Sequence, residues 1–171
     1  MHEMSHIIET TDIDAAGRTF EFAADESQRQ ALAARLGLVD LKKLTVAGNI
    51  RRAPDGPSIL VDGRFLAEVE QKCVVTLEPV GSTLEEAFHV RFLAPADWQA
   101  YCARDVDAEP EDEDVEPLEA ASIDLAATVT EYLALAIDPY PRRRDAEFTF
   151  DTGAEVDPGP FAALAKLRNK V

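Results

Sequence analysis

The sequence is short of the features that mark several well-known classes of protein. It has two cysteines in 171 residues, Cys73 and Cys102, which is too few for a disulfide framework. No run of 18 apolar residues occurs, so we expect no membrane-spanning helix. The first ten residues lack the basic and apolar regions of a secretory signal peptide. Together these absences predict a reducing, cytoplasmic compartment and no membrane partner.

Basic residues are scarce as well. The chain has 17 lysines and arginines against 33 aspartates and glutamates, which gives a net charge of −16. A protein that binds nucleic acid along its whole length needs a basic face, so we expect no DNA partner. An acidic protein can still contact RNA through a local basic patch, or bind a basic protein. Ribosomal proteins are the most abundant basic proteins in a bacterium.

Motifs that carry catalysis or bind a metal are absent. The sequence contains no Gly-x-Ser-x-Gly, no His-Glu-x-x-His and no glycine-rich phosphate loop. Its histidines, His2, His6 and His89, are scattered and are interpreted as surface residues. Cys73 lies among alternating apolar residues, so we interpret it as a small buried apolar side chain. We therefore predict a protein that is not an enzyme and that has no cofactor and no metal site.

The clearest positive pattern is an alternation of apolar and polar residues over 59–77. Its apolar members are Ile59, Val61, Phe65, Ala67, Val69, Cys73, Val75 and Leu77. A period of two predicts a strand with one buried face. Pro79 and Gly81 interrupt the pattern, and a second alternating run continues to Phe92. We expect an antiparallel hairpin with its turn at 79–81, a bend or bulge at Gly63, and a central place in the fold.

The other segments predict both strands and helices. Strands are expected at 6–10, 18–24 and 41–50, and helices at 25–36, 124–137 and 161–169. Asp25 and Gln28 have the spacing of a capping box, Gly37 is a stop signal, and Asp124 is a candidate N-cap. The predicted fold class is α+β, with an antiparallel sheet that is either open or curled towards a barrel.

An acidic run separates the two halves of the chain. Nine acidic residues and no basic one lie between Asp105 and Glu119. Such a run is typical of a flexible, solvated loop. We predict a single domain over 1–171, with a β-rich part at 1–93, an acidic loop at 94–121 and a helical part at 122–171. Calcium binding is disfavoured because Pro110 stands where a calcium loop needs glycine. The sharper hypothesis is that residues 105–119 engage a basic protein, and the resemblance described below implies a ribosomal one.

Basic residues gather in four short clusters. Each cluster alone is interpreted as solvated surface. The alternative is that they converge into one patch that contacts RNA phosphates, those of ribosomal RNA if the resemblance described below holds. Two clusters are Lys42-Lys43 and Arg51-Arg52. The candidate binding residues come from the other two clusters: Arg142, Arg143, Arg144, Lys166, Arg168 and Lys170.

Four blocks of the sequence, in this order and spacing, resemble the YceD family, in particular its alphaproteobacterial branch. The blocks are QKCVVTLEPV at 71–80, FHVRFL at 88–93, IDL at 123–125 with EYLALAIDP at 131–139, and PFAALAKLR at 160–168. The family is named for accumulation of large-subunit ribosomal RNA. The resemblance therefore implies a role in ribosome assembly, with a ribosomal protein, an assembly factor or ribosomal RNA as partner.

The chain departs from part of that family. Many relatives have a second cysteine three positions after the one that matches Cys73, and further cysteines after the buried helix. Here Thr76 takes that position and residues 140–150 contain no cysteine. A structural zinc site needs about four ligands, so metal binding is not carried over.

The resemblance implies a non-enzymatic factor that supports accumulation of large-subunit ribosomal RNA through protein or RNA contacts. Two alternatives remain open at this point. One is an RNA-processing enzyme or a subunit of one. The other is an acidic binding module for basic proteins unrelated to ribosomes.

Overall fold

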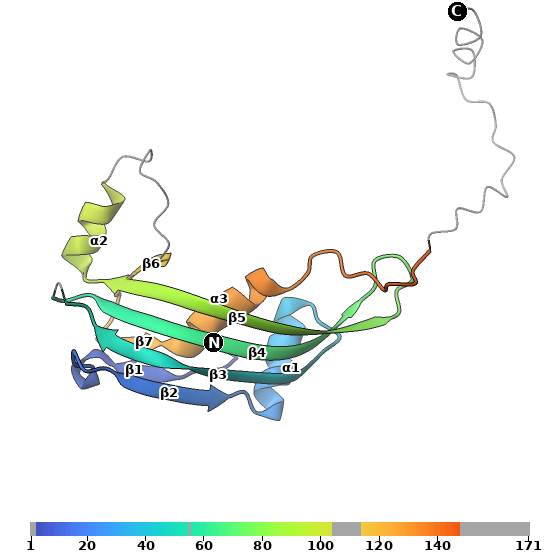
Figure 1. Ribbon diagram of the computed structural model, residues 1–171, viewed down its shortest axis with the longest axis horizontal. Coiled ribbons are helices and arrows are strands. Elements are labelled where there is room, and N and C mark those ends of the chain that lie inside the picture. Colours follow the sequence, from blue (N-terminus) through green and yellow to red (C-terminus); the bar gives the residue numbers. More distant parts are fainter. Residues whose placement is uncertain (1–2, 55, 104–113, 148–171) are drawn as a thin grey trace, which may run out of the picture.

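The computed structural model describes residues 3–54, 56–103 and 114–147, which form an α+β fold (Figure 1). Its elements are β1 (Ile7–Glu9), η1 (Thr10–Asp12), β2 (Arg18–Ala23), α1 (Glu26–Leu36), β3 (Asp40–Arg52), β4 (Ile59–Lys72), β5 (Pro79–Leu93), α2 (Pro95–Cys102), β6 (Asp114–Pro117), β7 (Ser122–Asp124) and α3 (Leu125–Ala136). A five-stranded sheet has the order β2-β3-β4-β5-β6, and β1 pairs with β7 in a second, two-stranded sheet. The strand pairs are antiparallel except β5–β6, which is parallel. The large sheet is open, so the barrel alternative does not apply.

The predicted hairpin is confirmed and lies at the centre of the large sheet. Strands β4 and β5 pair along their whole length, from Ile59 opposite Phe92 to Lys72 opposite Pro79. The predicted turn position is wrong, because the chain turns at 73–78 and Gly81 lies inside β5. Apolar alternation therefore runs past the end of the strand. Leu77 does not point inward: it is 72% exposed and has a positive φ of 61°.

Gly63 serves a different purpose from the predicted bend. The pairing register is continuous at this residue, whereas the bulge lies near the start of β3. A Cβ atom on Gly63 would lie 2.3 Å from the ring of Phe88, which faces it on β5. On β3, Gly48 makes the same kind of room for Phe20, at 2.5 Å. The two glycines are paired with each other across β3 and β4. In this row of the sheet, the rings of Phe20 and Phe88 therefore occupy the space that the missing side chains of the glycines leave free.

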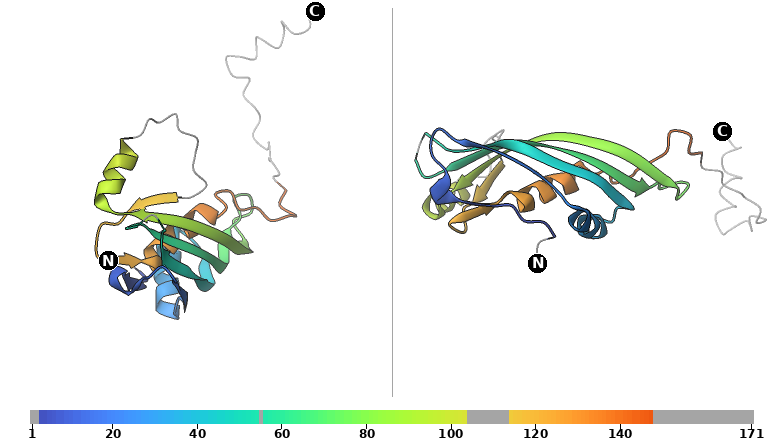
Figure 2. Two further views of the ribbon diagram at one scale, coloured as in Figure 1. Left: turned by 60° about the vertical axis from the view of Figure 1, so that its left-hand side comes forward. Right: turned by 90° about the horizontal axis from the view of Figure 1, so that it is seen from below.

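Helices α1 and α3 cover the concave face of the large sheet (Figure 2). Helix α1 begins with a complete Asp25–Gln28 capping box and ends at Gly37, whose φ is 67°. Helix α3 begins at Asp124, whose side chain accepts a hydrogen bond from the backbone N–H of Ala126. All three cap predictions are confirmed. The core joins both helices to the inward face of β3, β4 and β5; its fully buried members include Leu32, Leu44, Ile50, Phe65, Val69, Leu125 and Leu133.

The segment 94–121 is only partly the loop that was expected. Pro95 opens α2, where the missing N–H of proline costs nothing. The rings of Trp98 and Tyr101 stack with centroids 5.7 Å apart on this helix. Further along, β6 adds to the edge of the sheet beside β5. Residues 104–113, which include part of the acidic run, and the helix predicted at 161–169 lie outside the described residues.

Candidate functional site: a hairpin tip and an acidic pocket

The turn of the β4–β5 hairpin is joined to the segment that follows α3. The backbone N–H of Val74 donates to the carbonyl oxygen of Pro141 at 2.9 Å. The side-chain amide of Gln71 donates to the carbonyl oxygen of Asp138 at 2.8 Å. Residues far apart in the chain therefore form one surface at this end of the molecule.

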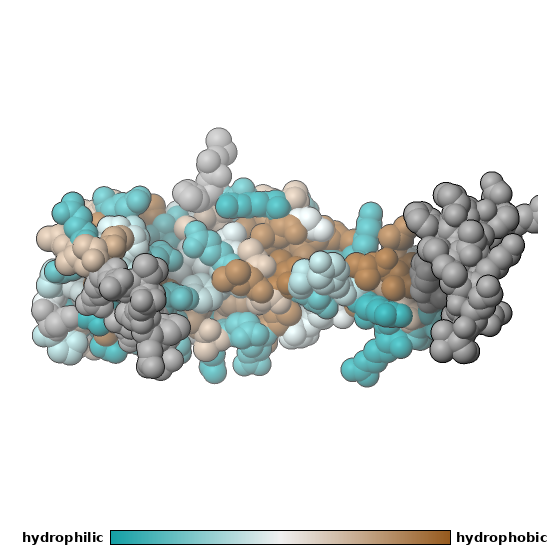
Figure 3. Space-filling model, turned by 90° about the horizontal axis from the view of Figure 1, so that it is seen from above, coloured by the Kyte–Doolittle hydropathy of each residue, from teal (hydrophilic) through white to brown (hydrophobic). Residues whose placement is uncertain are grey.

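We call this the hairpin-tip surface and define it by five exposed residues: Val74, Leu77, Tyr140, Arg142 and Arg144. Its apolar members are 51%, 72% and 76% exposed, in that order. Leu135, near the end of α3, is also exposed, at 82%. Figure 3 shows apolar residues running from the middle of this face towards the hairpin tip. A patch of this kind on a protein surface is a mark of an interaction site.

Cys73 holds the turn together from inside. Its side chain is fully buried, as predicted, but it lies in the turn and not on a strand. The sulfur accepts a hydrogen bond from the backbone N–H of Thr76 at 3.4 Å. Hydrogen bonds from Thr76 and from the backbone of Arg143 lower the pKa of the thiol from 9.0 to about 6. The sulfur is thus an acceptor that links the turn to the segment after α3, and its burial keeps it from reagents in solvent.

The first three candidate binding residues lie at the hairpin tip, and their side chains make different contacts. The guanidinium of Arg143 pairs with Glu78 and with Asp145, the latter at 2.8 Å, so this side chain belongs to the turn. Arg142 is exposed, and one of its N–H groups donates to the carbonyl oxygen of Ala146. Arg144 is exposed to solvent. The remaining candidates, Lys166, Arg168 and Lys170, lie outside the described residues.

The other two basic clusters are not brought together. Lys42 and Arg51 lie near opposite ends of β3, nine residues apart, which is about 30 Å along a strand. Lys42 pairs with Glu70 at 2.6 Å, at the hairpin-tip end of the sheet. Arg52, at the other end, donates to the carbonyl oxygens of Thr10 and Ile13 and so secures the loop after β1. The hypothesis that all basic clusters converge into one patch is therefore wrong for the three clusters that the structure describes, because Arg51-Arg52 lies far from Lys42-Lys43.

A pocket of about 540 Å³ is lined in part by β6 and β7. Figure 1 shows these two strands at the end of the molecule away from the hairpin tip. The pocket lies between α3, β6 and the β1–β7 pair, and we call it the acidic pocket. Its lining residues include Phe92, Leu118 and Ile123 as apolar members and Glu116, Glu119 and Glu131 as acidic ones. The pocket is lined by no lysine, arginine or histidine from the described part of the chain.

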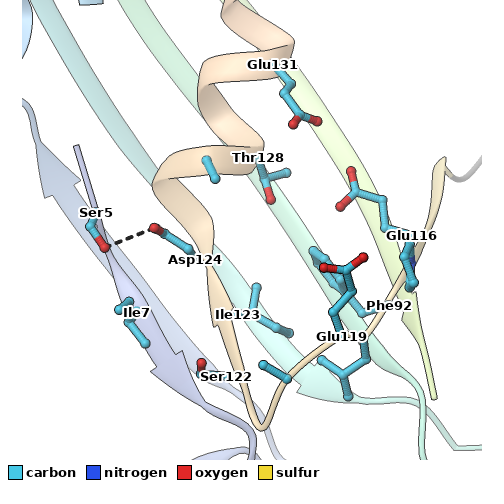
Figure 4. Close-up of a pocket in the computed structure, with 14 residues that line it drawn as sticks. Ser5, Ile7, Phe92, Glu116, Glu119, Ser122, Ile123, Asp124, Thr128 and Glu131 are labelled. Carbon is cyan, nitrogen blue, oxygen red and sulfur yellow. Dashed lines mark hydrogen bonds between the residues drawn. The ribbon is translucent and has the colours of Figure 1, made fainter. Parts of the chain in front are cut away.

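The three glutamates come from three different places and converge. Figure 4 shows the carboxylates of Glu116, Glu119 and Glu131 turned towards the space beside Thr128. Asp124 also lines the pocket, but its carboxylate turns away to accept from the hydroxyl of Ser5 at 2.9 Å. Burial raises the pKa of Glu116, and the nearby charges of Glu131 and Asp114 raise it further. Ionisation of this carboxylate is therefore less favourable than ionisation of an exposed glutamate.

Tyr132 connects α3 to β6. Its hydroxyl donates a short hydrogen bond to the carboxylate of Asp114, at the start of β6. Burial and that carboxylate raise the pKa of Tyr132. The ring also packs against Phe88, with centroids 5.3 Å apart. The acidic pocket is thus held open by ordered contacts on β5, β6 and α3.

The acidic pocket was not predicted from the sequence. Two of its glutamates belong to the acidic run, which was interpreted as solvated loop. The available signal was the spacing of Thr128 and Glu131, which places two polar residues on one face of an otherwise apolar helix. Parallel pairing of β6 with β5 brings the two parts together, and sequence patterns do not show such pairing.

Two negative findings apply to residues 3–54, 56–103 and 114–147. No group of three or more His, Cys, Asp or Glu side chains is placed to hold a metal ion. No helix in these ranges is long and apolar enough to cross a membrane.

The fold and its two surfaces define an acidic α+β protein with a basic and apolar hairpin tip at one end and an acidic pocket at the other. A family model described as "Large ribosomal RNA subunit accumulation protein YceD" matches residues 61–168, which is more than half of the chain. The chain therefore belongs to the YceD family, and the resemblance is confirmed. Searches of curated proteins and of solved structures gave no match.

Proposed function

We propose that this protein is a non-enzymatic, cytoplasmic ribosome-biogenesis factor. It supports accumulation of large-subunit ribosomal RNA by contacting ribosomal proteins, assembly factors or the RNA itself. The observation that carries the proposal is the family match over residues 61–168. The family description names an RNA that accumulates and names no chemical reaction, which favours binding over catalysis.

The hairpin-tip surface supports contact with RNA or protein. Tyr140 and Leu77 are exposed side chains on which a base or an apolar residue can stack. Arg142 and Arg144 flank them with guanidinium groups that suit phosphate oxygens. We assign Arg142 and Arg144 as RNA-contacting residues, together with Lys166, Arg168 and Lys170 near the end of the chain. Arg143 has a different role, because it holds the turn.

The alternative of an RNA-processing enzyme has less support. Carboxylates line the acidic pocket, and their charge has the same sign as that of a phosphate backbone. Cys73 is buried and has no histidine among its hydrogen-bond partners. The experiment below distinguishes the proposed function from the alternative of a binding module unrelated to ribosomes.

The test is complementation of a deletion strain, with the ratio of large-subunit to small-subunit ribosomal RNA as the readout. We expect deletion to lower the ratio, the wild-type chain to restore it, and Arg142→Ser/Arg144→Ser to restore it only in part. Arg18→Ser/Arg64→Ser is the matched control, since it removes the same charge from exposed positions on β2 and β4. An unchanged ratio in the deletion strain would contradict the proposed function.

A further inference from the structure

We propose that the acidic pocket binds a lysine or arginine side chain from a basic segment of a partner protein. Three carboxylates, the hydroxyl of the buried residue Thr128 and an apolar floor line it, on α3, β6 and the segments beside them. This names the class of partner. The site itself is supported by the contacts, charges and burial of the lining residues, and its role in ribosome assembly rests on the proposed function.

The charges of the pocket call for a cation. None of Glu116, Glu119 and Glu131 forms an ion pair within the described residues. Glu116 is half-buried, and its neighbours Glu131 and Asp114 carry the same charge. These like charges repel that of Glu116, and the repulsion is felt most at Glu116 because Glu119 and Glu131 are exposed to water. A bound ammonium or guanidinium group would remove that repulsion, and an RNA phosphate would add to it.

Thr128 gives a second, independent reason. Its side chain is only 5% exposed, and it lines the pocket from the inner side of α3. Figure 4 shows its hydroxyl directed into the space between the glutamates. This hydroxyl has no hydrogen-bond partner among the residues that the structure describes, in contrast to Thr130, which donates to the carbonyl oxygen of Ala126. The oxygen of this hydroxyl is open to the pocket, so a ligand N–H group can donate a hydrogen bond to it.

The apolar residues at the base of the pocket favour an amphipathic side chain over a free ion as the ligand. Phe92 and Ile123 are 5% and 3% exposed and form the base of the pocket with Leu118. Lysine and arginine carry three or four methylene groups that cover such a surface while the charged head reaches the carboxylates. A free metal ion would leave this floor wet, and the described residues offer no cluster that could ligate one. The volume of about 540 Å³ leaves room for a side chain and part of its backbone.

The probe is a fluorescein-labelled peptide of alternating arginine and glycine, measured by fluorescence anisotropy with the full chain at low ionic strength. The matched ligand has citrulline in place of arginine, which keeps the shape and removes the charge. The pocket variant is Glu116→Gln/Glu119→Gln/Glu131→Gln. The control variant is Glu68→Gln/Glu85→Gln/Glu86→Gln, which makes the same change of charge at exposed positions on β4 and β5.

We expect the pocket variant to weaken arginine-peptide binding about tenfold or more, and the control variant to weaken it less than about threefold. Thr128→Val keeps the shape of the side chain and all charges, and we expect an affinity about fivefold lower. Thermal unfolding of each variant shows that it is folded. The citrulline peptide should bind no variant measurably.

Four results would overturn the inference: no binding of the arginine peptide to the wild type, equal losses in the pocket and control variants, wild-type affinity for Thr128→Val, or equal binding of the citrulline peptide. Each is independent of the complementation experiment. If the wild-type chain restores the ribosomal RNA ratio and the peptide result is negative, the pocket inference fails and the proposed function stands. If the deletion leaves the ratio unchanged, the peptide measurement still decides the pocket.

Discussion

The sulfur of Cys73 accepts a hydrogen bond from the backbone N–H of Thr76, three residues further along the same turn. The backbone of Arg143, from the segment after α3, also hydrogen-bonds to the sulfur. These N–H groups replace water around a side chain that solvent does not reach. One thiol thus connects the tip of the central hairpin to the segment that carries Tyr140 and Arg142.

The first prediction concerns the pH dependence of stability at Cys73. Its pKa is lowered from 9.0 to about 6 in the folded protein, so the folded state favours the thiolate. The stabilisation is therefore complete above the unfolded pKa of 9.0, and it is lost as the pH falls through about 6. We expect the difference in unfolding free energy between wild type and Cys73→Ala to grow from pH 6 to pH 9, as measured by urea denaturation. A constant difference over this range would contradict the hydrogen-bonding role. Cys102→Ala, at an exposed cysteine, is the control.

The second prediction tests the row of rings and glycines across the sheet. A Cβ atom on Gly63 would lie 2.3 Å from the ring of Phe88, so Gly63→Ala forces the ring or the strand to move. We expect a loss of about 1–3 kcal/mol in unfolding free energy, the usual cost of overpacking a core. Gly81→Ala is the control, because the nearest atom to its Cβ would be a carbonyl oxygen of Val69 at 4.0 Å. Equal stability of the two variants would show that Phe88 does not depend on Gly63.

Local patterns predicted the central hairpin and both long helices, because each depends on residues near one another in the chain. The Asp25–Gln28 box and the Asp124 cap are of this kind. The hairpin turn was misplaced for an equally local reason. Val75 and Leu77 happen to continue the apolar parity beyond the strand, and Pro79 looked like a breaker although it is the first residue of β5, where proline is tolerated.

Features that depend on distant contacts were not predictable in the same way. Helix α2 is eight residues long and buries none of them, so its sequence shows no apolar stripe. Strand β6 has four residues and joins the sheet by parallel pairing with β5. The acidic pocket exists because β6 turns Glu116 towards Thr128 on α3. The candidate arginines were found from composition, but the pairing of Arg143 with Glu78 required the fold.

The third prediction separates binding from stability at the hairpin tip. Tyr140 and Leu77 are 76% and 72% exposed, so Tyr140→Ser/Leu77→Ser removes little buried surface. We expect the unfolding free energy to stay within about 0.5 kcal/mol of wild type for each substitution. Complementation of the deletion strain should nevertheless fall, because the exposed apolar groups are lost. Full complementation by this double variant would show that the apolar part of the tip is not used.

The fourth prediction concerns Glu116 in the acidic pocket. Burial, together with Glu131 and Asp114, raises its pKa above 4.5 in the folded protein. The folded state therefore holds this proton more tightly than the unfolded chain, and stability falls as the pH rises from 4.5 through the folded pKa. Glu116→Gln cannot ionise, so we expect it to be more stable than wild type at neutral pH by about 0.5 kcal/mol, a value on the scale of solvent-screened charges.

The same variant should lose that advantage below pH 4.5, where wild-type Glu116 is protonated in both states. Denaturation in urea at several pH values measures both effects. Glu85→Gln, at an exposed position on β5, is the control and should show no such gain at neutral pH. If Glu116→Gln is less stable than wild type at neutral pH, then Glu116 already has a favourable partner, and the unmet charge on which cation binding depends is absent.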